Sequence, residues 1–72
     1  MEMIKFYADA PDGSKNKFLS YKVKDISNSL DLLLRFKAKG WKIRRAYHHF
    51  ENGKQISIHS RVINNELFNN EP

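Results

Sequence analysis

Cysteine is absent from the 72-residue sequence, which excludes both a disulfide framework and a thiolate metal site. Small domains often depend on one or the other for stability. Glycine and proline are also scarce, at three and two residues, and no glycine-rich phosphate-binding loop is present. A fold of this size must therefore be stabilised by side-chain packing, or by association with a partner.

Long hydrophobic runs are missing as well. The longest apolar runs contain three residues, such as Leu32–Leu34, whereas a membrane-spanning helix needs about 20. No secretory hydrophobic region opens the sequence. We therefore expect a cytoplasmic protein with no membrane segment.

The composition is that of a small folded domain with a basic charge. Hydrophobic residues make up 40% of the chain, and they include five Phe, three Tyr and one Trp, which is more than a disordered tail would contain. We expect one domain over residues 1–64 and a polar C-terminal tail over residues 65–72. The net charge of +5 favours encounters with polyanions without specifying one.

Two segments alternate between apolar and polar residues, which is typical of half-buried strands. Residues 3–8 direct Ile4, Phe6 and Ala8 to one face, and residues 18–24 direct Leu19, Tyr21 and Val23 to one face. Turn-forming residues lie between the two segments, at Pro11–Ser14. The sequence predicts a hairpin here.

Residues 25–40 have helical spacing instead. One arc of the predicted helix is apolar and contains Ile26, Leu30, Leu33, Leu34 and Ala38. Asp25 or Ser27 can cap its N-terminus, and Gly40 suits the left-handed position after its end.

Two further apolar residues of the helix, Leu32 and Phe36, lie on the flank of this arc. Either they belong to a wide buried stripe or they contact another protein or a second copy of the chain. Together with Phe18 they are the candidate residues of a partner interface.

Asn52-Gly53 lies between two strand-like segments and predicts a two-residue hairpin turn. Counting outward pairs Phe50 with Gln55 and Tyr47 with Ile58. The predicted core face then contains Trp41, Ile43, Tyr47, Ile56, Ile58 and Val62, and the opposite face contains most of the basic residues. Strict alternation along the strand places the charged Arg45 on the core face. We therefore expect its side chain to extend to the rim of the sheet, to pair with a carboxylate, or to belong to a β-bulge at Arg44–Arg45 that resets the register.

The elements together predict an α+β fold of order ββαββ. Its four-stranded, mainly antiparallel sheet is covered on one face by the helix.

No arrangement of residues in the sequence indicates catalysis. Ser57 opposite His48 is the nearest approach to a nucleophile with its base, but no carboxylate or oxyanion loop accompanies it. His48 and His59 are diagonal neighbours without a third metal ligand, and the nearby arginines repel a cation. We therefore predict that the protein is not an enzyme and has no metal, no cofactor and no small-molecule substrate.

The open face of the sheet is the candidate binding surface. Its basic and aromatic residues favour single-stranded nucleic acid or RNA, because bases stack on aromatic rings while Lys and Arg contact phosphates. The candidate nucleic-acid-binding residues are Lys42, Arg44, His48, His59, Arg61, Phe50 and Tyr7. The alternative is a protein–protein interaction module or a small inhibitor, including a homodimer, since aromatic residues and Arg also anchor protein interfaces.

Overall fold

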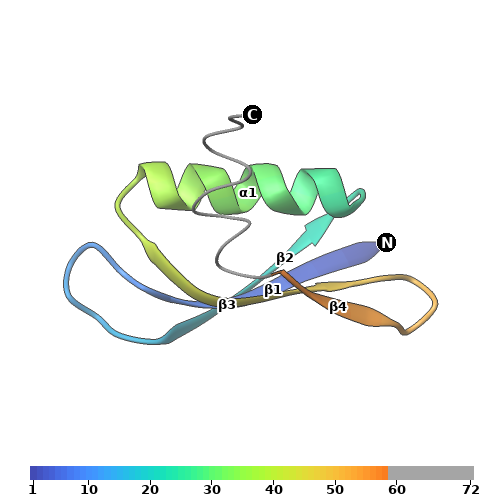
Figure 1. Ribbon diagram of the computed structural model, residues 1–72, viewed down its shortest axis with the longest axis horizontal. Helices are drawn as coiled ribbons and strands as arrows, with labels where there is room; N and C mark the ends of the chain where they lie inside the picture. Colours follow the sequence, from blue (N-terminus) through green and yellow to red (C-terminus); the bar gives the residue numbers. More distant parts are fainter. Residues whose placement is uncertain (59–72) are drawn as a thin grey trace, which may run out of the picture.

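The computed structural model describes residues 1–58. It contains one antiparallel sheet in the order β2-β1-β3-β4 and one helix, α1, which lies along one face of the sheet (Figure 1). The elements in chain order are β1 (Glu2–Asp9), β2 (Lys17–Val23), α1 (Ile26–Ala38), β3 (Lys42–His49) and β4 (Gln55–Ile58). The predicted ββαββ order and α+β class are confirmed.

The connection between β2 and β3 runs through α1, and it places the helix and the sheet in two layers. Strands β2 and β3 are both antiparallel to β1, so they run parallel to each other, and α1 crosses over β1 to join them. Parallel strands need a crossover of this kind. No helix in residues 1–58 is long and apolar enough to cross a membrane.

The hydrophobic core lies between the sheet and α1. Ile4, Phe6 and Ala8 of β1 are fully buried, as the alternation predicts. Leu19 and Tyr21 pair with Phe6 and Ile4 and therefore share their face of the sheet. The predicted inward faces of both N-terminal strands are confirmed.

The helix begins and ends where the sequence predicts. The Asp25 carboxylate accepts a hydrogen bond of 2.9 Å from the Asn28 N–H, which caps the first turn. Gly40 has a φ of +98°, the left-handed conformation that follows a helix end.

The buried face of α1 is rotated from the predicted arc. Ser29 and Leu33 are the buried residues of the helix, whereas Ala38 of the predicted arc is exposed. Leu32 and Phe36 are partly buried against the core. Their packing agrees with the wide buried stripe, so these two positions on the helix contribute to the core.

A β-bulge interrupts β3. Tyr7 pairs with Arg45 and Ala8 pairs with Ile43, so Arg44 is an extra residue opposite β1. A regular strand alternates its side chains between the two faces, and a bulge breaks this alternation. Of the three alternatives for Arg45, the β-bulge at Arg44–Arg45 is the one that the structure contains.

The bulge decides the direction of four consecutive side chains. Ile43 and Ala46 are both buried in the core, and the two residues between them, Arg44 and Arg45, both lie on the open face. Arg44 binds Asp9 there, and Arg45 shares the face of its partner Tyr7.

The turn between β3 and β4 differs from the prediction. The Phe50 N–H donates to the Lys54 carbonyl at 2.8 Å, and the Gly53 N–H donates to the Phe50 carbonyl at 3.1 Å. Gly53 has a φ of +92°. This is a three-residue loop in which glycine takes the left-handed position. The predicted two-residue turn is wrong, and the pairing shifts by one residue, to His49 with Gln55 and Ala46 with Ile58.

The bulge corrects the predicted faces of β3. Tyr47 was expected in the core and His48 on the open face, but His48 is fully buried and Tyr47 lies on the open face, opposite Lys5. The predicted faces of Ile56 and Ile58 hold, because the one-residue shift of the turn offsets the one-residue shift of the bulge. Ile58 is buried, and Ile56 is 42% exposed at the edge of the sheet.

Asp9 holds the bulge in place. One of its carboxylate oxygens accepts a hydrogen bond from Arg44 Nε at 2.9 Å and forms an ion pair with Nη2 at 2.8 Å. The other oxygen accepts from the Asn16 N–H at 2.8 Å. The hydrogen bonds from the Arg44 guanidinium and then from Asn16 lower the pKa of Asp9 from 3.8 to about 2. The folded state therefore prefers the ionised carboxylate.

This pKa predicts a specific pH dependence of stability for the Asp9→Asn variant. A carboxylate with a lowered folded-state pKa stabilises the fold above its unfolded pKa, and the contribution is lost as the pH falls from about 4 to about 2. Wild type should be more stable than Asp9→Asn at pH 6, and the difference should shrink toward pH 2. Urea unfolding across this range measures it. A difference that stays constant would show that the Asp9 carboxylate does not anchor the bulge.

Candidate nucleic-acid interface

The open face of the sheet, opposite α1, combines aromatic and basic side chains from three strands. Phe18, Tyr7 and Arg45 form one row across β2, β1 and β3, and Lys5 and Tyr47 are paired in the next row. The Tyr7 and Phe18 ring centroids are 5.1 Å apart. Aromatic and cationic side chains are therefore neighbours on this face.

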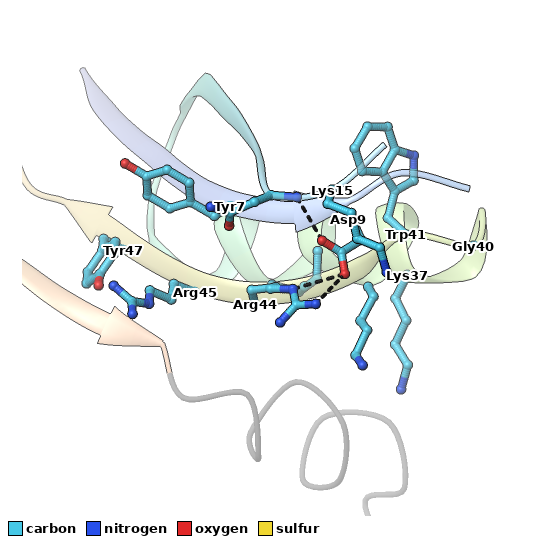
Figure 2. A pocket seen from close by; sticks show the side chains of 12 residues that line it. Tyr7, Asp9, Lys15, Lys37, Gly40, Trp41, Arg44, Arg45 and Tyr47 are labelled. Atoms are coloured by element: carbon cyan, nitrogen blue, oxygen red, sulfur yellow. Dashed lines mark hydrogen bonds and ion pairs between the residues drawn. The ribbon is translucent and has the colours of Figure 1, made fainter. Parts of the chain in front are cut away.

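A groove lies at one end of this face, where α1 leads into β3. Residues that line it come from β1, the β1–β2 loop, the end of α1 and β3 (Figure 2). They are Tyr7, Asp9, Lys15, Asn16, Lys37, Gly40, Trp41, Lys42, Ile43, Arg44, Arg45 and Tyr47. Among these described residues, five are cationic and one is a carboxylate, so the groove attracts anions.

The aromatic residues of the groove differ in their roles. Trp41 packs edge-on against Phe36, with ring centroids 5.3 Å apart, and it is partly buried against the core. Tyr7 and Tyr47 lie on the sheet itself and are both half-buried. The two tyrosines are thus placed to stack with a planar ligand, while Trp41 also joins the groove to the core.

The two arginines of the bulge are not equivalent. Arg44 binds both its Nε and its Nη2 to Asp9 and so has a structural role. Arg45 is exposed, and Figure 2 shows its side chain extending toward Tyr47. Within residues 1–58 no hydrogen bond or ion pair occupies the Arg45 guanidinium, which leaves it available for a ligand.

Three of the predicted nucleic-acid-binding residues line this groove: Tyr7, Lys42 and Arg44. His48 does not, because the bulge turns it into the core, where no nucleic acid can reach it. Phe50 lies on the helix side, in edge-on contact with His48 at 4.6 Å between ring centroids. The prediction of these two residues on the open face is wrong. His59 and Arg61 lie outside the described residues.

The sequence prediction missed five residues of the groove that carry a positive charge or an aromatic ring. They are Lys15, Lys37, Trp41, Arg45 and Tyr47. A register drawn with the bulge at Arg44–Arg45 would have placed Arg45 and Tyr47 correctly. Lys15 lies in a loop and Lys37 in the helix, so strand alternation contains no signal for either.

A separate polar cluster lies in the core. The His48 ring contacts Ser29 Oγ through Nδ1 at 2.6 Å and Glu2 Oε1 through Nε2 at 2.6 Å. With Glu2 ionised, Nε2–H donates to the carboxylate, and the Nδ1 of a neutral ring accepts from the Ser29 hydroxyl. The cluster therefore ties α1, β3 and β1 together.

Ser29, His48 and Glu2 are connected in the same order as the serine, histidine and carboxylate of a catalytic triad, but the resemblance ends there. Ser29 and His48 are both fully buried, so a substrate has no access to the hydroxyl. The predicted approach of Ser57 to His48 does not occur, because Ser57 pairs with Tyr47 on the other face. In residues 1–58 no group of three or more His, Asp or Glu side chains is arranged to hold a metal ion.

Comparison of the chain with protein-family models, with curated proteins and with solved structures finds no match.

The buried cluster predicts that Ser29→Ala is destabilising. Removing the hydroxyl leaves His48 Nδ1 buried without a partner, which costs about 1–3 kcal/mol. Ser27→Ala is the matched control, because Ser27 is exposed on the same helix and gains the same helix propensity. Equal free energies of unfolding for the two variants would contradict a stabilising role for the cluster.

Proposed function

We propose that the protein is a small, non-enzymatic binding module for single-stranded nucleic acid, and that the groove on its open sheet face is the binding site. The observation that supports this most is the meeting of five cationic and three aromatic side chains in one groove. Phosphates of a single strand would contact the cations, and its bases would stack on the rings.

The distribution of exposed apolar residues favours nucleic acid over a protein partner for this face. The large hydrophobic residues exposed within residues 1–58 are Met1, Phe18, Tyr21 and Ile56. Phe18 is on the open face, while Tyr21 and Ile56 share the helix side of the sheet at its two edges. An apolar protein-docking patch would be continuous, whereas here Lys5 and Arg45 flank the rings of the open face.

The groove suggests how a strand would lie in it. Tyr7 and Tyr47 offer two stacking platforms on neighbouring strands. Arg45 pairs with Tyr7, and its side chain extends toward Tyr47 (Figure 2). Lys15, Lys37 and Lys42 surround the end of the groove near Trp41. With Arg44 engaged by Asp9, Lys15, Lys42 and Arg45 would supply about three phosphate contacts, which corresponds to a slope near −2 in a plot of log K against log salt.

The decisive variant is Lys42→Ala with Arg45→Ala. Loss of two phosphate contacts should weaken binding of a fluorescent oligothymidine or oligouridine and should flatten the salt slope by about 1.4. Fluorescence anisotropy across a series of KCl concentrations measures both. The matched control is Lys24→Ala with Lys54→Ala, which removes the same charge from the opposite end of the sheet and should leave the slope unchanged.

Stacking is tested separately by Tyr47→Ala. Losing one stacked base costs about 1–3 kcal/mol, or roughly 5-fold to 150-fold in affinity, without changing the salt slope. If wild type does not bind either oligonucleotide at low salt, or if the groove variant binds like the control, nucleic acid is not the ligand. A protein partner would then be the better explanation of the surface.

A further inference from the structure

Strand β2 forms one edge of the sheet. Its outer backbone N–H and C=O groups have no strand partner within residues 1–58, and such an edge is a template for another strand. Two large apolar side chains are exposed on this one strand of seven residues, Phe18 at 54% and Tyr21 at 38%. They lie on opposite faces of the sheet, so a strand added at this edge would cover part of both.

The sequence of β2 is complementary to itself in one antiparallel register. If a two-fold axis passes through Ser20, Leu19 lies opposite Tyr21 of a second copy. Both side chains are on the helix side of the sheet, where Tyr21 contacts Phe36 with ring centroids 5.7 Å apart. The new pair would therefore extend the hydrophobic core across the junction.

The open face is matched in the same register. Phe18 lies opposite Lys22 of the second copy, an arrangement that allows a cation–π contact. On the helix side, Lys17 lies opposite Val23, so no two like charges face each other across the junction. If the axis moves by one residue, Ser20 lies opposite Phe18 or Lys22 of the second copy, and Phe18 no longer lies opposite Lys22.

We propose that two copies of the chain associate through their β2 strands about an axis at Ser20. The product is one continuous eight-stranded sheet, in which Lys22 of the second copy lies beside Phe18 at the margin of the aromatic and basic face. A two-fold contact of one surface with itself is the commonest way for identical chains to associate. This inference does not rest on nucleic-acid binding, because the edge is independent of what the groove holds.

The absence of cysteine allows a direct test by single cysteines. In Ser20→Cys the two thiols would face each other at the axis, with Cβ atoms about 4.5–5.5 Å apart, close enough to form a disulfide after a small adjustment. In Lys22→Cys they would be offset by four residues, about 13 Å along the strand. Under mild oxidation and without nucleic acid, Ser20→Cys should become a covalent dimer and Lys22→Cys should stay monomeric.

A mixture gives the complementary result. When the single variants Phe18→Cys and Lys22→Cys are mixed, they should form a mixed disulfide. Of the registers with the axis at residue 19, 20 or 21, only the one at Ser20 sets residue 18 of one copy opposite residue 22 of the other. All three positions are exposed, and circular dichroism checks that each variant is folded. A Ser20→Cys chain that does not crosslink, or a Lys22→Cys chain that crosslinks equally fast, would overturn the proposed register.

Sedimentation of the unmodified chain tests association itself. Wild type should sediment as a dimer at millimolar concentration. Tyr21→Lys should shift it to monomer, because this change places a cation against Leu19 of the second copy. A wild-type monomer at this concentration would overturn the inference and would leave the test of nucleic-acid binding unaffected.

Discussion

An extra residue in β3 determines which side chains face the helix and which face solvent. Arg44 has no opposite residue in β1, and the strand therefore changes parity between Ile43 and Ala46. Both of these residues reach the core, while two arginines reach the open face together. The ion pair between Arg44 and Asp9, with a hydrogen bond of 2.9 Å from Nε and an Nη2–Oδ2 distance of 2.8 Å, holds this irregular segment against its neighbour.

The composition of the core follows from the same change of parity. Beyond the bulge the inward position in β3 falls on His48, which is fully buried. A buried imidazole must have partners for its ring nitrogens, and Ser29 and Glu2 supply them. Ser29 thus explains why the buried face of α1 differs from its most apolar arc: the helix also supplies a polar contact to the core.

The binding face depends on the bulge in turn. Since Tyr47 lies outside the core, it joins Tyr7 and Arg45 on the open side of the sheet, next to the cations at the end of α1 and in the β1–β2 loop. Asp9 neutralises Arg44 and leaves Arg45 without a partner among the described residues. One carboxylate therefore fixes the strand geometry and also decides which arginine can meet a ligand.

Local signals in the sequence predict much of this structure. The alternation in β1 and β2, the Asp25 cap and Gly40 give the first three elements correctly, because each signal acts within a few residues. The bulge could be suspected from Arg45, whose charge contradicts its expected inward position. The faces of Tyr47 and His48 follow from this bulge, whereas the pairing of β4 also depends on a loop length that Asn52-Gly53 leaves open.

Two cations of the groove could not be predicted from the sequence, for a different physical reason. Lys15 and Lys37 come from a loop and a helix, and their approach to Lys42 depends on how α1 lies on the sheet. The buried contact of Ser29 with His48 also joins residues 19 apart in the chain. Its only trace in the sequence is a serine beside the apolar residues of the helix.

Native-state thiol labelling at residues 45 and 46 tests the bulge most directly. Each of the variants Arg45→Cys and Ala46→Cys contains a single cysteine, and unfolding in urea gives the reference rate for an accessible thiol. The bulge predicts that the thiol at 45 reacts in the folded protein nearly as fast as in urea, whereas the thiol at 46 is protected. A regular strand with Ile43 inward reverses this order, so a reactive thiol at 46 and a protected one at 45 would contradict the bulge and the binding face built on it.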